Sequence, residues 1–337
     1  MTHKKASKSK IFTLLFSLIM CLAFIPSIAK ASPTSTVYAE GETLTPYDRI
    51  YINSEALNSG WYLDESYTQK KGNPTSDYVA KYKDGVLTLN NYHGGEIGTS
   101  APASGYYKID LIGENTINGG QRGVFIDTSR EGRVTITSSV NGKLTINASS
   151  ANSVWGIACG ASNSVKTTDV VIGGNAQVTI NATSNGENKQ VDGIHARNVT
   201  IEDNASVNIT AKNTNNSTAS QWVAGIFAEN NVTINTNGNI DIDATVAGGD
   251  RAYSYGIQTS NVTFPKITDM TIKWEKGSGN GLPISPKDKV DSTTHAINED
   301  HTNCFASYRY GTPRYVAAIN GALAGPGVPK EANSGCG

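Results

Sequence analysis

The chain has 337 residues and a formal net charge of −1, from 28 basic and 29 acidic side chains. That balance argues against nucleic acid or an anionic membrane surface as the main partner, because both are bound through clustered Lys and Arg. The composition is rich in Thr, Val, Ile, Asn and Gly with only 3 Met, which favours β structure, and 4 cysteines are too few for a disulfide scaffold.

The first 31 residues have the pattern of a secretory signal peptide. A positive leader ending at Lys10 precedes an apolar run from Ile11 to Ile28, and Ala29-Lys30-Ala31 matches the small-x-small pattern of a signal-peptidase site. A membrane anchor is the alternative, but Pro26 and the small residues that end the run favour cleavage. We therefore predict a secreted, extracellular protein beginning at Ser32, with or without attachment to a cell surface, and with no membrane span after cleavage. Its formal net charge would be −6, because the leader carries five lysines and no acid.

Residues 32–84 are predicted to form an N-terminal linker and cap. This segment precedes the first copy of a repeat, and Trp61 lies within its Tyr47–Tyr82 portion. A repeat protein needs protected ends, because the terminal units have no neighbour on one side.

A threefold pattern recurs about every 32 residues between 85 and 275. Glycine followed by Val or Ile comes first, at Gly123, Gly156, Gly193, Gly225 and Gly256. A second element of the form V-T-I begins at Val134, Val170, Val199, Val232 and Val262. A third, of the same apolar–polar–apolar form, begins at Leu144, Val178, Val207, Ile240 and Met270. Each element alternates apolar and polar residues, which predicts a short strand with one buried face.

Three short strands per repeat, separated by turns rich in Gly, Asn and Asp, predict an all-β solenoid. In such a parallel β-helix the equivalent strands of successive coils pair, and each repeat covers its neighbour's apolar surface. The alternative is an antiparallel sandwich or propeller, which should show Asn-Gly hairpin turns at regular intervals. Asn141-Gly142 and Asn237-Gly238 are isolated, so the parallel β-helix is favoured. The tail, 276–337, is predicted to be a C-terminal cap or partly disordered.

Aligning the coils predicts rows of outward side chains. One row holds Phe125, Ala158, His195, Phe227 and Gln258, and a second row, two residues on, holds Asp127, Gly160, Arg197, Glu229 and Ser260. Other aromatic residues precede the glycines, beside loops of variable length. Rings flanked by polar groups suit sugars, whose C–H faces pack on rings while hydroxyls form hydrogen bonds. We therefore predict a ligand-binding set of Phe125, Trp155, His195, Arg197, Trp222, Phe227, Glu229 and Tyr255. The alternative is that Phe125 and Phe227 form a satellite core beneath the loops.

A catalytic role for His195 as base and Arg197 as anion stabiliser is considered but not favoured. Acid–base catalysis needs a positioned partner and a perturbed pKa, and the sequence displays neither. The favoured interpretation is a solvated pair on a strand face, so no catalytic residue is predicted.

No cofactor or metal site is predicted, although Ca²⁺ is considered at Asp241 and Asp243. Both point outward from one strand and carry oxygen ligands, but Lys273 on the adjacent coil opposes a cation, and Ca²⁺ takes six to eight oxygens. A solvated carboxylate pair is favoured. Cys159 falls at an inward position and is predicted to be a buried free thiol; pairing of Cys304 with Cys336 is left open.

The phrase G-V-L-T-L-N-N-Y at 85–92, followed by I-D-L-I-G-E-N-T-I at 109–117, resembles a pattern in large secreted or surface proteins of gut and soil bacteria. Those proteins are described as uncharacterised or carbohydrate-binding-domain proteins, and they are similar to the right-handed parallel β-helix superfamily that includes pectate lyases. The resemblance covers roughly residues 47–275. It implies a right-handed helix and an extracellular role with polysaccharide, sometimes with calcium. It carries over no catalytic residue, since neither paired Asp motifs nor a lyase-like Arg motif occurs at matching positions.

Three functions follow as hypotheses. The first is a non-catalytic extracellular module that binds polysaccharide or a cell-surface glycan, or that mediates adhesion. The second is a polysaccharide lyase or glycoside hydrolase of the same fold, and the third is a structural spacer without a small ligand. The outward rows hold mostly Thr, Asn and Ser with few charges, which places the enzyme last, and the binding module is favoured over the spacer.

Overall fold

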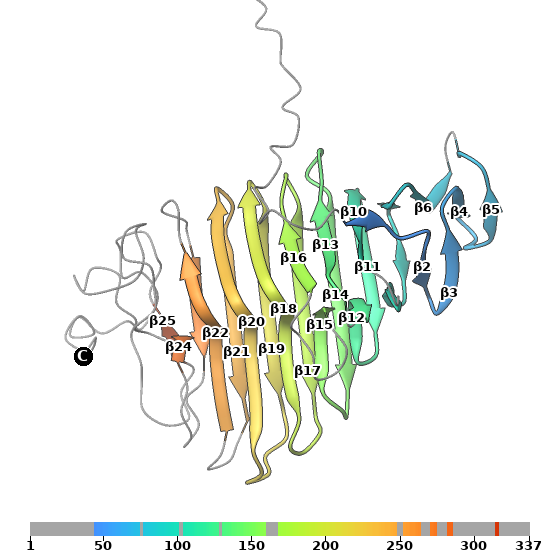
Figure 1. Cartoon of the computed structure of the whole chain (residues 1–337). Helices are drawn as coiled ribbons and strands as arrows, with labels where there is room; N and C mark the ends of the chain where they lie inside the picture. The colour runs from blue at the N-terminus through green and yellow to red at the C-terminus, as the bar shows by residue number, and fades with distance from the viewer. Residues whose placement is uncertain are drawn as a thin grey trace, which may run out of the picture. The chain divides into compact units, whose positions relative to one another are not determined.

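The computed structural model describes residues 44–74, 77–100, 104–127, 130–159, 168–247 and 252–263, and the backbone of three further strands at 270–274, 282–285 and 314–316. The predicted signal peptide and most of the predicted tail, with Cys304 and Cys336, lie outside this range. Every described element is a strand, and the strands stack in parallel into a β-solenoid of about five turns (Figure 1). The predicted fold class is therefore confirmed.

Each coil contributes one strand to each of three parallel stacks, in the chain order 1, 2, 3. Stack 1 contains β9 (Ile97–Ser100), β12 (Arg122–Asp127), β15 (Val154–Cys159), the first parts of β18 (Gln190–Asp203), β20 (Gln221–Thr236) and β22 (Ala252–Thr263), and β24 (Leu282–Ser285). Stack 2 contains β7 (Val86–Asn90), β10 (Gly105–Ile112), β13 (Gly132–Thr137), β16 (Thr168–Ile172) and the second parts of β18, β20 and β22. Stack 3 contains β8 (His93–Gly94), β11 (Glu114–Gly119), β14 (Lys143–Ser150), β17 (Gln177–Ser184), β19 (Ser206–Asn213), β21 (Ile240–Val246) and β23 (Met270–Trp274).

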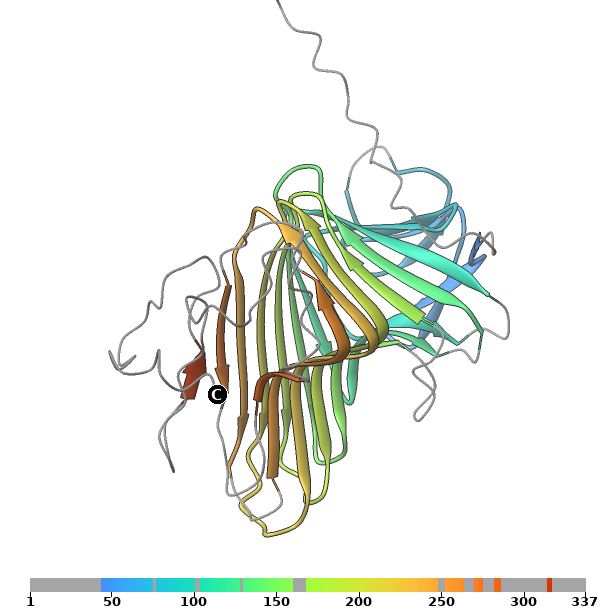
Figure 2. The same cartoon turned by 60° about the vertical axis from the view of Figure 1, so that its left-hand side comes forward.

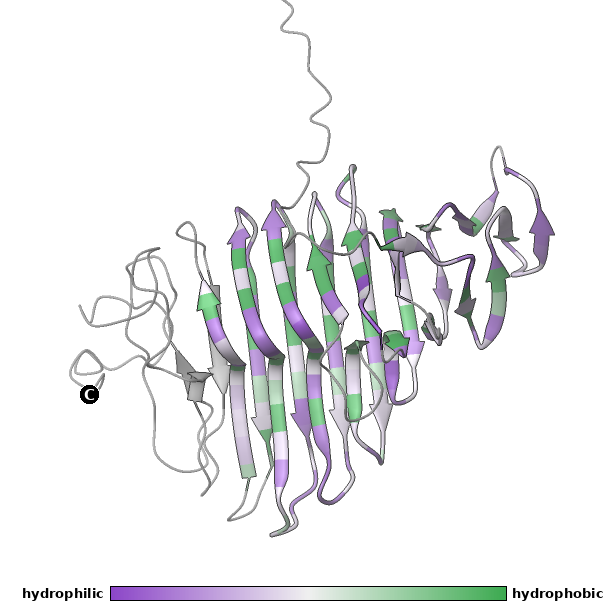
Figure 3. Cartoon of the chain, viewed as in Figure 1, coloured by the Kyte–Doolittle hydropathy of each residue, from purple (hydrophilic) through white to green (hydrophobic). Residues whose placement is uncertain are grey.

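The strand register is the one that the repeat predicts. The apolar residue after each repeated glycine pairs with its equivalent on the next coil, and all five of these side chains are fully buried: Val124, Ile157, Ile194, Ile226 and Ile257. Apolar and polar bands alternate along the strands in Figure 3, as a one-sided core requires. Cys159 pairs with Ile126 and is a buried free thiol, as predicted.

The last described coils bend sharply between stacks 1 and 2. There β18, β20 and β22 each run continuously through both stacks and turn part-way along their length (Figure 2). The pairing of β18 with β20 shifts register at this corner, from Ala196 opposite Ala228 to Asn198 opposite Asn231. An additional residue at such a point increases the local bend.

The repeated glycines separate two cores. The main core lies within the three stacks, while a second core of small side chains joins the end of stack 3 to the start of stack 1: Ala148, Val154, Ala182, Val191, Ala211, Val223, Ala244, Val246 and Ala252. Between the two cores, stack 1 and stack 3 approach each other closely. A Cβ atom on Gly193 would overlap the Cγ2 methyl of Ile209, and Gly156 and Gly225 meet Ile side chains in the same way. The glycine recurs because the facing isoleucine occupies the space of a side chain.

Side-chain ladders join successive coils. Amide side chains donate to one another along three rows: Asn118–Asn147–Asn181, Asn175–Asn204–Asn237 and Asn198–Asn231–Asn261. Five turns that lead from stack 2 to stack 3 each place one residue at positive φ: Asn91, Gly113, Asn141, Gly174 and Asp203. Asn, Asp and Gly adopt that conformation at the lowest cost.

The solenoid begins under the predicted N-terminal cap. The cap strands are β1 (Thr45–Pro46), β2 (Arg49–Ile52), β3 (Glu55–Asn58), β4 (Trp61–Asp64), β5 (Gln69–Lys71) and β6 (Tyr78–Lys83). The antiparallel pairs β2–β9 and β6–β7, with β1 beside β10, occupy the backbone groups of the first coil. At the other end β25 (Arg314–Val316) pairs antiparallel with β23. Covered edges cannot template pairing with another chain.

Candidate functional site

Most of the predicted ligand-binding residues lie on the outward side of stack 1. The row Phe125, Ala158, His195, Phe227 and Gln258 is continuous in the strand register, as predicted. A second row consists of the residues immediately before the glycines, from Arg122 through Trp155, Asp192 and Ala224 to Tyr255. We call Phe125, Trp155, His195, Trp222, Phe227, Tyr253 and Tyr255 the aromatic strip.

The rings of the strip pack on one another along the stacking direction. His195 stacks on Phe227 with ring centroids 4.8 Å apart, and Trp155 meets His195 edge-on at 6.1 Å. Trp222 contacts both Tyr253 and Tyr255 at 5.3 Å, and its indole N–H donates to Gln258 Oε1 at 2.9 Å. The rings thus form two pre-organised clusters, one around His195 and one around Trp222.

Exposure divides the strip in two. Phe125 is 5% exposed and lies under the Arg122 guanidinium, whose carbon is 3.9 Å from the ring centroid. Tyr255 is also buried, whereas Trp155, Trp222 and Phe227 keep part of their surface in solvent. Phe125 therefore fits the satellite-core alternative, and the half-buried rings are the ones that can meet a ligand.

A buried carboxylate lies behind the strip. Asp192 is fully buried, and its Oδ2 accepts from Gln190 Nε2 at 2.8 Å and lies 2.6 Å from His195 Nδ1. The burial raises the pKa of the Asp192 carboxyl, and the hydrogen bond with His195 opposes that rise. The Trp155 indole N–H lies close enough to lower the same pKa, although no hydrogen bond of good geometry joins the two groups.

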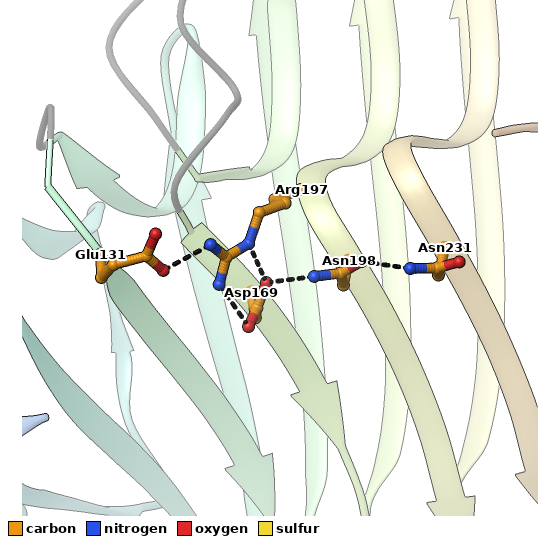
Figure 4. A network of polar contacts seen from close by, with 5 residues as sticks. All are labelled: Glu131, Asp169, Arg197, Asn198 and Asn231. Atoms are coloured by element: carbon orange, nitrogen blue, oxygen red, sulfur yellow. Dashed lines mark hydrogen bonds and ion pairs between the residues drawn. The ribbon is translucent and has the colours of Figure 1, made fainter. Parts of the chain in front are cut away.

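Arg197 belongs to a separate polar network at the corner between stacks 1 and 2 (Figure 4). Its guanidinium donates to both carboxylate oxygens of Asp169, at 2.8 and 2.9 Å, and forms an ion pair with Glu131. Asp169 also accepts from Asn198 Nδ2 at 2.8 Å, which connects the network to an asparagine ladder. The contacts of Arg197 with Asp169 and Glu131 thus join three successive coils.

The sequence predicts an outward row in which Arg197 aligns with Glu229, and the observed geometry differs from that prediction. The register shift at the corner places Asn198 opposite Asn231, so no row of paired residues runs from Arg197 to Glu229. Arg197 instead reaches back to the two preceding coils. Its two carboxylate partners leave it engaged in the fold, so it contributes little positive charge to the strip.

Two half-buried carboxyls give the fold a pH dependence. Burial raises the pKa of Asp110 and of Glu202, and for Glu202 the neighbouring Asp203 adds to the effect. The stability that such groups confer is complete below their unfolded pKa of about 4 and is lost as pH rises through the higher folded pKa. We expect these two groups to stabilise the fold more as pH falls from about 7 toward 4, against the opposite contribution of Asp64 and Glu114, whose pKa values are lowered by their lysine partners. Thermal unfolding at constant ionic strength should show Asp110→Asn and Glu202→Gln gaining in midpoint, relative to the unsubstituted protein, as pH rises from about 4 to 7, and parallel profiles would contradict this.

No group of three or more His, Cys, Asp or Glu side chains converges on a metal-sized site within the described ranges. Asp241 pairs with Thr271 and Asp243 pairs with Lys273, so the adjacent strand places a lysine at the position opposite Asp243. A small pocket in the cap, bordered by Asn53, Glu55 and Tyr67, lies among β2, β3 and β4, outside the strip. In the part of the chain that the structure describes, no helix is long and apolar enough to cross a membrane.

Asp192, Asp169 and Glu131 are not among the residues predicted from the sequence. A signal for Asp192 was present, because it immediately precedes Gly193 just as Trp155 precedes Gly156 and Tyr255 precedes Gly256. Asp169 and Glu131 gave no comparable signal, since the loops before stack 2 differ in length between coils.

No protein-family model, curated protein or solved structure matches this chain.

Proposed function

We propose that this protein is a secreted, non-catalytic module that binds extracellular polysaccharide or a cell-surface glycan through the aromatic strip. The observation that carries the proposal is the cluster of half-buried rings on the outward side of stack 1, Trp155, His195, Phe227 and Trp222, in which His195 and Phe227 pair directly in the strand register. The rings come from the neighbouring strands β15, β18 and β20, so the cluster extends along the stacking direction, which suits a polymer of pyranose units lying across these coils. We further propose kinship with the right-handed parallel β-helix superfamily, on the resemblance in 85–117.

The test is binding of soluble polysaccharides, measured by affinity electrophoresis with and without Ca²⁺. Phe227→Ala and Trp222→Ala should each weaken binding about tenfold, equivalent to about 1.4 kcal/mol. Tyr106→Ala is the matched control, because Tyr106 is a half-buried aromatic on stack 2. Equal weakening by Tyr106→Ala would place binding elsewhere, and no binding to any polymer would favour a structural spacer.

A second candidate, a glycan-cleaving enzyme, rests on the contact between His195 and the buried Asp192. A carboxylate that orients an imidazole is a recurrent arrangement for a general base. Release of reducing ends or unsaturated products from the bound polymer would bring this candidate forward. Unchanged polymer in the complex would support the binding module.

A further inference from the structure

The contact between Asp192 and His195 depends on the kink at the repeated glycine. Side chains three residues apart on a regular strand point to opposite faces. Here the pairing of β15 with β18 skips Gly193, going from Trp155–Asp192 to Ile157–Ile194, so both Asp192 and His195 face outward. The fold therefore brings a fully buried carboxylate against one edge of a partly exposed imidazole.

This contact determines which imidazole nitrogen carries the proton. Asp192 Oδ2 accepts from Gln190, and the ionised carboxylate is acceptor-only, so with Asp192 ionised the Nδ1 atom of His195 is the donor. In a neutral imidazole Nε2 is then an acceptor. Nε2 forms no hydrogen bond with any described residue and is not enclosed, and the His195 side chain is 16% exposed. Stacking on Phe227 sets the plane of the ring.

Two arginines on this side of the solenoid are engaged by other groups. Arg122 lies over Phe125 and 3.8 Å from Asp127, and Arg197 is held by Asp169 and Glu131. An outward lone pair attracts a hydroxyl donor and repels a carboxylate or sulfate. The polar group at the centre of the strip thus selects for an uncharged sugar.

We propose that Asp192 is a positioning residue that holds His195 with Nε2 outward, where it accepts a hydrogen bond from a hydroxyl group of an uncharged pyranose polysaccharide. This inference rests on the proposed function of the aromatic strip and assigns that strip a ligand class. Asp192 itself, being fully buried, does not touch the ligand.

The first experiment measures the tautomer directly. Long-range ¹H–¹⁵N NMR spectra of the purified chain distinguish protonated from unprotonated imidazole nitrogens, and His195→Phe identifies the signals of His195. We expect Nδ1 to be protonated and Nε2 unprotonated at pH 8. Asp192→Ala should shift the ring toward the other tautomer, because it removes the oxygen that accepts from Nδ1. Asp110→Asn, at a half-buried site on stack 2, is the control and should change nothing.

The second experiment compares β-glucan and xylan with polygalacturonate and alginate as ligands. The neutral polymers should bind, and both Asp192→Ala and His195→Phe should weaken that binding about tenfold while Asp110→Asn does not. His195→Phe keeps a ring beside Phe227, so loss of stacking does not explain its effect.

The outcomes separate the two proposals. Binding of acidic polymers that weakens in Phe227→Ala, without binding of neutral ones, would overturn the ligand class and leave the strip as the binding surface. A proton on Nε2 in the unsubstituted protein would overturn the positioning role alone. Absence of binding to all four polymers would overturn both the proposed function and this inference.

Discussion

Gly193→Ala is expected to lower the free energy of unfolding by about 3 kcal/mol, the upper range for overpacking a well-packed core. The new methyl group would overlap the Cγ2 atom of Ile209 and would lie 2.5 Å from the Gly225 carbonyl oxygen. Neither neighbour can yield easily, because one is the branch of a fully buried β-branched side chain and the other is strand backbone. Chemical denaturation monitored by circular dichroism measures the loss.

Gly120→Ala is the matched control for this substitution. A Cβ atom at Gly120 would have no neighbour within 4 Å and φ there is not positive, so the change should stay within about 0.5 kcal/mol. Adding Ile209→Val to Gly193→Ala should not restore stability, since valine keeps the branch, whereas Ile209→Ala should restore part of it. Equal denaturation midpoints for the two glycine variants would show that the sheets can separate at little cost.

Arg197→Ala is expected to cost about 2 kcal/mol, because it leaves two carboxylates without their cation. Removing one partner of a buried ion pair costs about 3–5 kcal/mol, and we reduce that figure because the side chains of Arg197, Asp169 and Glu131 are 21%, 16% and 34% exposed. Thermal unfolding at neutral pH measures the loss.

Lys143→Ala provides the comparison for Arg197. Lys143 forms an ion pair with Glu114 at 2.7 Å, but the two side chains are 53% and 72% exposed. Exposed pairs contribute little, so this change should alter stability by less than about 0.5 kcal/mol. If Arg197→Ala and Lys143→Ala behaved alike, the corner network would be a surface feature with no role in joining the coils.

The register of the solenoid was predictable because a strand has a period of two. Once Val124, Ile157 and their equivalents are aligned, every inward and outward position on the same strand follows. The outward row through His195 and Phe227 came from this rule alone, as did the burial of Cys159. The rule extends only as far as the strand remains regular.

The period-two rule fails at two irregular points, the glycine kink and the corner between stacks 1 and 2. The glycine kink places Asp192 and His195 on one side, and the corner after Ala196 redirects Arg197 toward Asp169 and Glu131. Both are backbone deviations whose size depends on packing between coils, which a one-dimensional pattern does not contain. Exposure is also a tertiary property: Phe125 and Phe227 occupy the same row, yet only Phe125 is fully covered.

The asparagine ladders repeat the same partners from one coil to the next, and so do the buried aliphatic rows. Among the described coils these contacts do not fix the number of repeats. Antiparallel pairs mark the two ends, with β2–β9 in the cap and β23–β25 at the other end. Duplication of one repeat of about 32 residues within the gene would therefore lengthen the molecule by about 4.8 Å and add one row to its surface without redesign of the interior. The length of the solenoid, and with it the length of the surface that it presents, can therefore change by one coil at a time.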